Sequence, residues 1–143
     1  MSGVARLGLF DGFGIEVETM IVREDDLGVF PVSDRVLVAA GDRGAEREVT
    51  RDETCWSNEL VLHVIERKTN GPRRSLDGLA AALFRDVRDI EAILAPLGGR
   101  LLPTAMHPLM DPLRETRLWP HGYGDVYRAY DRAFGCQGHG WSN

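Results

Sequence analysis

Two glutamates, Glu16 and Glu18, interrupt an otherwise apolar stretch, FGIEVETMIV, at residues 13–22. A carboxylate in such a stretch loses hydration and needs a compensating partner. If residues 13–22 form a strand, side chains two apart share a face, so both carboxylates point the same way. Such a pair can hold a hard divalent cation together with phosphate oxygens bound to it. The alternative is a half-buried strand with a solvated acidic face.

A second pair of acids, Glu59 and Glu66, lies in residues 56–68, WSNELVLHVIERK, which predict a second strand. A spacing of seven puts these two side chains on opposite faces of a regular strand. They converge only if Glu59 precedes the regular pairing or a bulge shifts the alternation. In the alternative interpretation, Glu59 is a surface charge where the strand begins, and Glu66 is an exposed end residue paired with Arg67 or Lys68.

Convergence of all four carboxylates would create a repulsion that demands one or more divalent cations. Mg²⁺ is the natural choice, because it prefers carboxylate oxygens and the chain has no Cys/His spacing typical of zinc sites. No G-x-x-x-x-G-K-[ST] motif is present, so the sequence contains no P-loop.

The histidines and cysteines are less informative. His63 is either a packed side chain or a ligand, His107 before Pro108 is suited to anchoring a turn, and His121 is expected in a loop. His139, flanked by glycines, is the most site-like of the four. Cys55 and Cys136 fit no C-x-x-C pattern and are interpreted as reduced thiols.

The remaining elements are predicted from periodicity. An amphipathic helix is expected from its N-cap Ser75 to Leu94, ending at Pro96, Gly98 and Gly99. Residues 23–53 are interpreted as a connection with a short helix capped by Ser33, followed by a mobile segment 41–53. A short strand within residues 99–108 is restricted to an edge or a bulge by Pro103. A second helical stripe is expected to pack in the core and comprises Tyr123, Val126, Tyr127, Tyr130 and Phe134.

Length and charge exclude several classes of protein. A chain of 143 residues fits one domain with a real core. With 17 Lys and Arg against 22 Asp and Glu and no basic block, nucleic acid and anionic membrane are not expected as main partners, which leaves small molecules or proteins. There is no apolar run of roughly 20 residues and no signal-peptide pattern at the N-terminus, so a cytoplasmic location is expected.

Four segments together resemble the N-terminal portion of the glutamate–cysteine ligase family and its carboxylate–amine ligase relatives: FGIEVETM, NELVLHVIERKTNGP, TAMHPLMDP and GCQGHGWSN. The resemblance runs from about residue 10 to the last residue. In that family an E-x-E pair and an acid-x₆-E pair hold Mg²⁺ around the phosphates of ATP. The resemblance therefore implies that Glu16, Glu18, Glu59 and Glu66 are metal ligands here.

The resemblance also implies a fold and a reaction. The fold would be α+β and similar to glutamine synthetase: a curved antiparallel sheet with helices on its outer face, incomplete in this chain. Residues 1–143 would form the N-terminal part of a single catalytic domain. The substrates would be ATP, glutamate and an amine such as cysteine, with the γ-carboxylate activated as an acyl phosphate before the amine attacks.

Family members are much longer than this chain, so we expect a fragment that does not ligate by itself and that can self-associate through an unpaired sheet edge. A second hypothesis is a non-catalytic metal-binding or assembly module derived from such a ligase. A third is an acidic-faced α+β domain that binds no metal.

Overall fold

A computed structural model describes residues 6–41 and 48–121, together with 126, 129–130 and 132–133. Its centre is one antiparallel sheet of five strands in the order β2-β3-β4-β1-β5. The strands are β1 (Glu16–Arg23), β2 (Glu48–Thr50), β3 (Thr54–Asn58), β4 (Val64–Thr69) and β5 (Gly99–Leu102). The expected α+β class with an antiparallel sheet is therefore confirmed.

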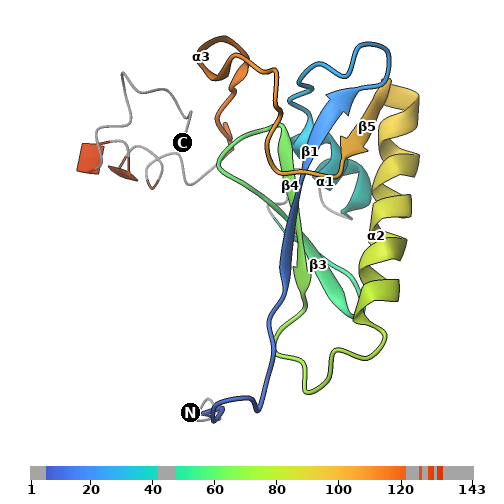
Figure 1. Cartoon of the computed structure of the whole chain (residues 1–143), viewed down its shortest axis with the longest axis vertical. Coiled ribbons are helices and arrows are strands. Elements are labelled where there is room, and N and C mark those ends of the chain that lie inside the picture. Colours follow the sequence, from blue (N-terminus) through green and yellow to red (C-terminus); the bar gives the residue numbers. More distant parts are fainter. Residues whose placement is uncertain (1–5, 42–47, 122–125, 127–128, 131, 134–143) are drawn as a thin grey trace.

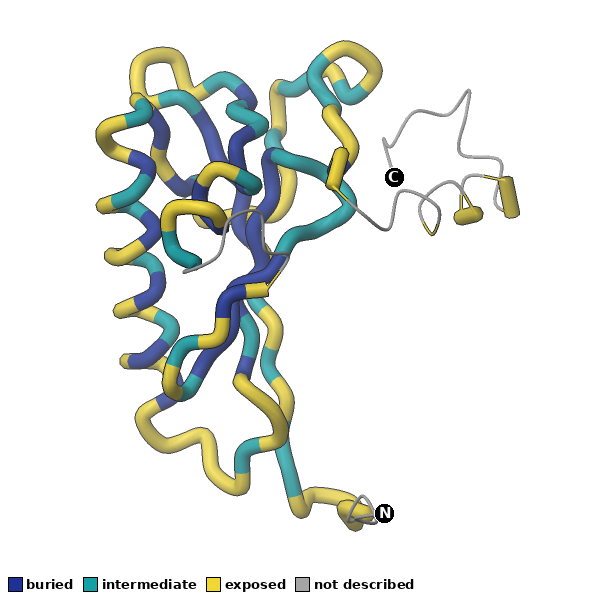
Figure 2. The backbone as a smooth tube through the Cα atoms, turned by 180° about the vertical axis from the view of Figure 1, so that it is seen from behind, coloured by how far each residue is buried: buried dark blue, intermediate teal, exposed yellow. Residues whose placement is uncertain are grey.

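Helices α1 (Ser33–Ala40) and α2 (Leu79–Leu94) cover one face of the sheet, and α2 runs along its whole side (Figure 1). A short 3₁₀ turn, η1 (Ala95–Leu97), continues α2, and α3 (Pro112–Glu115) lies on the other side of the sheet. Buried residues concentrate in the strands and on the inner side of α2 (Figure 2). None of the helices in the described residues is long and apolar enough to cross a membrane.

The core lies between the sheet and these two helices. Its buried residues are Ile21, Val32, Val36, Leu37, Val49, Trp56, Ile65, Ile90, Leu94, Leu101 and Trp119. On β1, alternation sends Ile21 to this face and Glu16, Glu18 and Met20 to the opposite one. The face away from α1 and α2 is therefore available for polar side chains.

The prediction of one strand over residues 56–68 is wrong. The chain reverses between Asn58 and Val64, so this stretch forms two antiparallel strands, β3 and β4, in which Asn58 pairs with Ile65. The intervening residues 59–63 resemble a strand because Leu62 packs against the core. They lack the Gly, Asn or Pro signals that usually mark a reversal.

Both predicted helix caps are also wrong, although the helices exist. Helix α2 begins at Leu79 after Gly78, which has φ 75° and no side chain to cap the helix, while the Ser75 hydroxyl bonds Asp77 at 2.7 Å. Helix α1 begins at Ser33 itself, and the residue at its N-cap is Val32. The predicted end of α2 is confirmed, because Gly98 adopts φ 75° directly after η1.

The remaining predictions differ in outcome. β1 begins at Glu16, and Phe13 instead makes an isolated bridge with Arg73. Residues 48–50 of the predicted mobile segment form β2, and residues 42–47 lie outside the described residues. The edge strand before Pro103 is confirmed as β5.

The predicted core role of the C-terminal helical stripe is wrong for the two residues that the structure describes. Val126 and Tyr130 are helical but exposed. Tyr123, Tyr127 and Phe134 lie outside the described residues.

Candidate functional site

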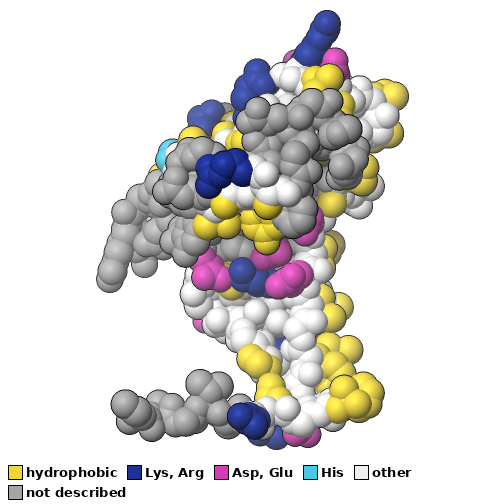
Figure 3. Space-filling view, turned by 90° about the vertical axis from the view of Figure 1, so that its left-hand side faces the viewer, with side chains coloured by type: hydrophobic (Ala, Val, Ile, Leu, Met, Phe, Trp, Pro, Cys, Tyr) yellow, Lys and Arg dark blue, Asp and Glu magenta, His cyan; other side chains and the backbone are white. Residues whose placement is uncertain are grey.

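Acidic side chains gather on the sheet face that α1 and α2 leave open. The β1–β4 register places Glu18 directly opposite Glu66, so these two side chains share this face. On the other side of β4, Ser57 of β3 also lies opposite Glu66. Figure 3 shows acidic side chains around a basic one on this face, bordered by hydrophobic side chains.

Glu59 joins this face because it follows β3, which ends at Asn58, and lies outside the paired strand. The alternation that separates Glu59 from Glu66 in a continuous strand does not apply once the chain reverses between them. The Leu60 amide donates to Glu59 Oε2 at 3.3 Å, and the Asn58 side chain donates to the Glu59 carbonyl oxygen at 3.1 Å. Local bonds therefore help to hold the Glu59 carboxylate where it reaches the sheet face.

The result is a cluster of three carboxylates, Glu18, Glu59 and Glu66, with one oxygen of each lying within 4.8 Å of the others. We call it the acidic triad. Its members differ in burial: Glu18 is exposed, Glu59 is half-buried, and Glu66 is only 7% exposed. The triad draws its three residues from β1, from β4 and from the loop between β3 and β4.

Neighbouring groups stabilise the buried carboxylate of Glu66. Ser57 Oγ donates to Glu66 Oε1 at 2.7 Å, and Lys68 Nζ lies 3.2 Å from the same oxygen. Lys68 also contacts Glu48 Oε1 at 3.1 Å. Burial disfavours the Lys68 ammonium, but its bonds to Glu48 and Glu66 outweigh this, and the pKa of Lys68 is raised.

The Glu59 carboxyl group is affected both by burial and by its charged neighbours. Burial, followed by the charges of Glu18 and Glu66, raises the pKa of Glu59 to about 7. Three carboxylates this close repel one another, and a protonated Glu59 relieves part of that repulsion. The triad is thus a set of oxygen ligands whose charge a bound cation would neutralise.

Glu16, the fourth predicted ligand, lies on the same face but outside the acidic triad. It is exposed, and its cross-strand partner is Lys68 rather than an acid. The bond of Ser57 to Glu66 is not evident from the sequence pattern. Recognising the β3–β4 reversal would have revealed it, because Ser57 and Glu66 then fall opposite each other.

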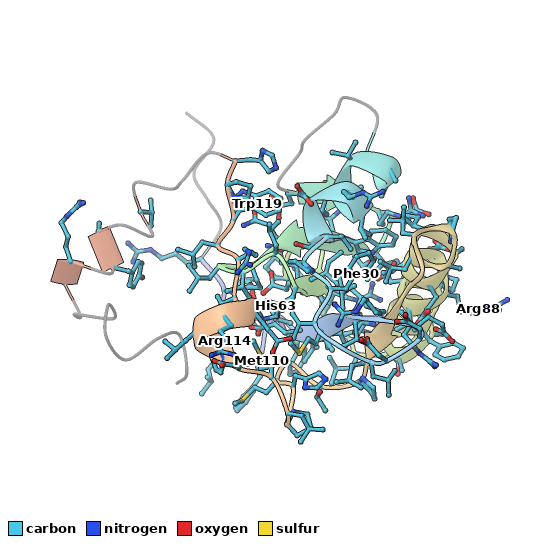
Figure 4. All side chains as sticks on the ribbon, turned by 90° about the horizontal axis from the view of Figure 1, so that it is seen from above. Phe30, His63, Arg88, Met110, Arg114 and Trp119 are labelled. Atoms are coloured by element: carbon cyan, nitrogen blue, oxygen red, sulfur yellow. The ribbon has the colours of Figure 1, made fainter. Side chains whose placement is uncertain are left out.

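A cavity of about 440 Å³ opens beside the acidic triad. Glu18 and Glu59 form its acidic side, and the opposite wall is mostly apolar; the lining also comprises Leu60, Val61, His63, Val64, Ala105, Met106, His107, Met110, Pro112 and Thr116. Figure 4 shows His63 and Met110 close to the ribbon of α3. Among the described residues that line this cavity there is no arginine.

Residues 12–142 match the model of glutamate-cysteine ligase family 2 (GCS2). The chain belongs to this family. A protein of Archaeoglobus fulgidus described as uncharacterized is 31% identical over 122 residues, which cover 85% of this chain and 32% of the relative. The chain thus spans about a third of that relative's length, and no solved structure matches it.

Three histidines, His63, His107 and His139, lie in the segments that resemble glutamate–cysteine ligases. His107 anchors a turn, as expected: its Nε2 lies 2.7 Å from the Leu27 carbonyl oxygen, and its Nδ1 accepts from the Leu109 amide at 3.0 Å. His63 is buried, and no described residue bonds its Nδ1; burial lowers the pKa of His63. His139 lies outside the described residues.

His121 Nε2 lies 3.0 Å from Asp34 Oδ2. Cys55 is a free, buried thiol, and burial raises its pKa to about 12, so it is unsuited to nucleophilic chemistry. Cys136 lies outside the described residues.

Three arginines gather away from the acidic triad. A second cavity, of about 770 Å³, lies between α2 and the β2–β3 turn, on the other side of the sheet, and contains Arg51, Arg85 and Arg88. Two of these arginines are in ion pairs of 2.9 Å, Arg51 with Asp89 and Arg85 with Glu53. Figure 4 shows Arg88 projecting outward from this side.

Proposed function

We propose that this chain supplies the metal-binding acidic face of an ATP- and Mg²⁺-dependent ligase that joins the γ-carboxylate of glutamate to an amine such as cysteine. The observation that carries the proposal is the convergence of Glu18, Glu59 and Glu66 from three separate segments. Family membership supports the ligase class. The glutamine synthetase-like curvature and the acyl phosphate intermediate are parts of this proposal.

The donor set fits the proposed cation. Three carboxylates within 4.8 Å of one another offer only oxygen ligands, which Mg²⁺ prefers, and Glu18 is exposed enough for a cation to enter from solvent. Ser57 bonds the Glu66 carboxylate and orients it, as the residues around metal ligands commonly do. Lys68 partly compensates the charge of Glu66 in the metal-free protein.

Mg²⁺ held by these carboxylates would supply charge neutralisation and orientation of the phosphate oxygens of ATP. The chain's own residues perform the positioning. Glu18 and Glu66 are fixed by the β1–β4 register, and Glu59 presents its carboxylate from the loop that borders the 440 Å³ cavity. The cavity beside the triad is the place that we assign to the substrate, with its acidic side toward the metal and its apolar wall opposite.

A titration with Mg²⁺ tests the proposal on the chain of 143 residues. We expect calorimetry to detect binding, and Glu66→Gln to weaken it at least about tenfold because it removes a ligand charge. Glu24→Gln is a matched control, since Glu24 follows β1 directly, is paired with Arg100 and lies outside the acidic triad. Absence of binding, or equal affinities for the two variants, would overturn the assignment.

The second candidate, a metal-binding or assembly module without ligase chemistry, is favoured by one observation. Among the described residues, no arginine lines the cavity beside the acidic triad, so no guanidinium is in place there to grip phosphates. Release of ADP that depends on both glutamate and an amine would support the ligase. Mg²⁺ binding without any ADP release by a full-length family member that carries the acidic triad would support the module.

A further inference from the structure

The loop of residues 59–63 carries Glu59 into the acidic triad, yet the pairing of β3 with β4 does not determine its position. Three neighbours hold the loop instead. From the core side, the Ser33 amide donates to the Leu62 carbonyl oxygen at 2.8 Å, and the Ile21 amide donates to the His63 carbonyl oxygen at 2.7 Å. The third neighbour is a segment distant in the sequence.

That neighbour is the segment 117–121, which we call the strap. It runs antiparallel to the loop: the Trp119 amide donates to the Leu60 carbonyl oxygen at 2.9 Å, and the Leu62 amide donates to the Arg117 carbonyl oxygen at 2.8 Å. The strap thus bonds the residue that directly follows Glu59.

Two side chains anchor the strap itself. Trp119 is 2% exposed and belongs to the core cluster. His121 packs edge-on against the Trp119 ring, with the ring centroids 5.2 Å apart, and its Nε2 lies 3.0 Å from Asp34 Oδ2 of α1. The Trp119 ring therefore anchors the strap to the core, and the His121 ring anchors it to α1.

We propose that the strap positions Glu59: Trp119, assisted by His121, holds the loop so that the Glu59 carboxylate stays beside Glu18 and Glu66. This inference rests on the proposed metal-binding function. Like charges within 4.8 Å push the Glu59 carboxylate outward when no cation is bound. The loop must resist that force, and the strap supplies backbone bonds next to Glu59 that the sheet does not.

Coupling between the strap and a bound cation acts in both directions. If the strap favours the loop conformation that binds the cation, cation binding must stabilise the strap by the same factor. Amide hydrogen exchange reports this directly, because opening of the strap exposes the amides of Trp119 and Leu62. In the unmodified chain, saturating Mg²⁺ should slow exchange at these two amides, and exchange that stays unchanged while Mg²⁺ binds overturns the inference.

Mg²⁺ binding by variants of the strap is the second test. Trp119→Leu should weaken Mg²⁺ binding about tenfold, as loss of residues behind metal ligands commonly does. Trp56→Leu is the matched control: Trp56 is another buried core tryptophan, on β3, and its Nε1, like that of Trp119, has no hydrogen-bond partner among the described residues. It should lower stability without changing Mg²⁺ affinity in the folded protein. Equal losses of affinity, or no loss for Trp119→Leu, contradict positioning by the strap.

His121→Ala keeps the experiment decisive if Trp119→Leu does not fold, because His121 is exposed and its loss leaves the core filled. We expect a smaller loss of Mg²⁺ affinity in this variant. A metal-free measurement separates this inference from the proposed function. In EDTA, His121→Ala should raise the NMR-detected mobility of the Glu59 side chain, and an unchanged mobility refutes the strap's role even if the chain binds no Mg²⁺.

Discussion

Replacing Glu59 by Gln should stabilise the metal-free protein at high pH and leave it unchanged at low pH. Folding raises the pKa of Glu59 from 4.5 to about 7, because of burial and the charges of Glu18 and Glu66. Between these two pH values the folded protein binds a proton that the unfolded chain has lost. Stability therefore falls as pH rises through this window, and the loss is complete above the folded pKa.

The size of the effect follows from the shift. At about 1.36 kcal/mol per pKa unit, the full shift corresponds to about 3 kcal/mol. Glu59 is only half-buried, so solvent screening reduces the expected gain for Glu59→Gln to roughly 1–2 kcal/mol at pH 8. At pH 4 a protonated Glu59 and a Gln are equivalent in charge, and the two proteins should be equally stable.

Urea denaturation in EDTA at pH 4, 6 and 8 measures this difference, and contributions from other titrating groups cancel between wild type and variant. Because the three carboxylates are coupled, the midpoint belongs to the acidic triad as a whole. Glu24→Gln, outside the triad, should show no such pH-dependent gain. A stability difference between wild type and Glu59→Gln that stays constant from pH 4 to pH 8 would refute the repulsion on which the site is built.

Three further outcomes are expected. Glu18→Gln should weaken Mg²⁺ binding more than Glu16→Gln in calorimetry, since Glu18 alone of the two belongs to the acidic triad; the opposite order would place the metal elsewhere. Lys68→Met should raise Mg²⁺ affinity in the same assay, because it removes a competing positive charge; reduced affinity would contradict this. Glu91→Ala should promote dimers in light scattering, because Glu91 Oε1 accepts the edge amide of Leu101 at 2.9 Å and its loss frees that amide for pairing; a monomer at all concentrations would argue against this edge.

The sequence predicts those parts of the fold that are encoded by a regular pattern. Helix α2 repeats its apolar residues every three or four positions over 16 residues, so its existence and its end at Leu94, before Pro96 and Gly98, were predictable. Its start was not, because Gly78 begins the helix without a capping side chain. Strand β5 was predictable as an edge because Pro103 follows it and cannot donate to a ladder.

The reversal between β3 and β4 could not be predicted from local pattern. Leu62 packs against the core, and the strap, which bonds Leu60 and Leu62, lies more than fifty positions away in the sequence. An apolar loop and an apolar strand look alike until the segment that covers the loop is known. For the same reason, the sequence pattern alone does not indicate that Trp119 holds the loop of residues 59–63, as we propose.

The site shows the same division between local and distant information. Alternation along one strand correctly put Glu16 and Glu18 on one face, but it treated them as equivalent. The neighbouring strand makes them different: Glu18 faces the carboxylate of Glu66, whereas Glu16 faces Lys68, whose ammonium bonds Glu48 and Glu66. An E-x-E motif therefore defines a shared direction, and the cross-strand register decides which of its two acids joins a cluster that needs a cation.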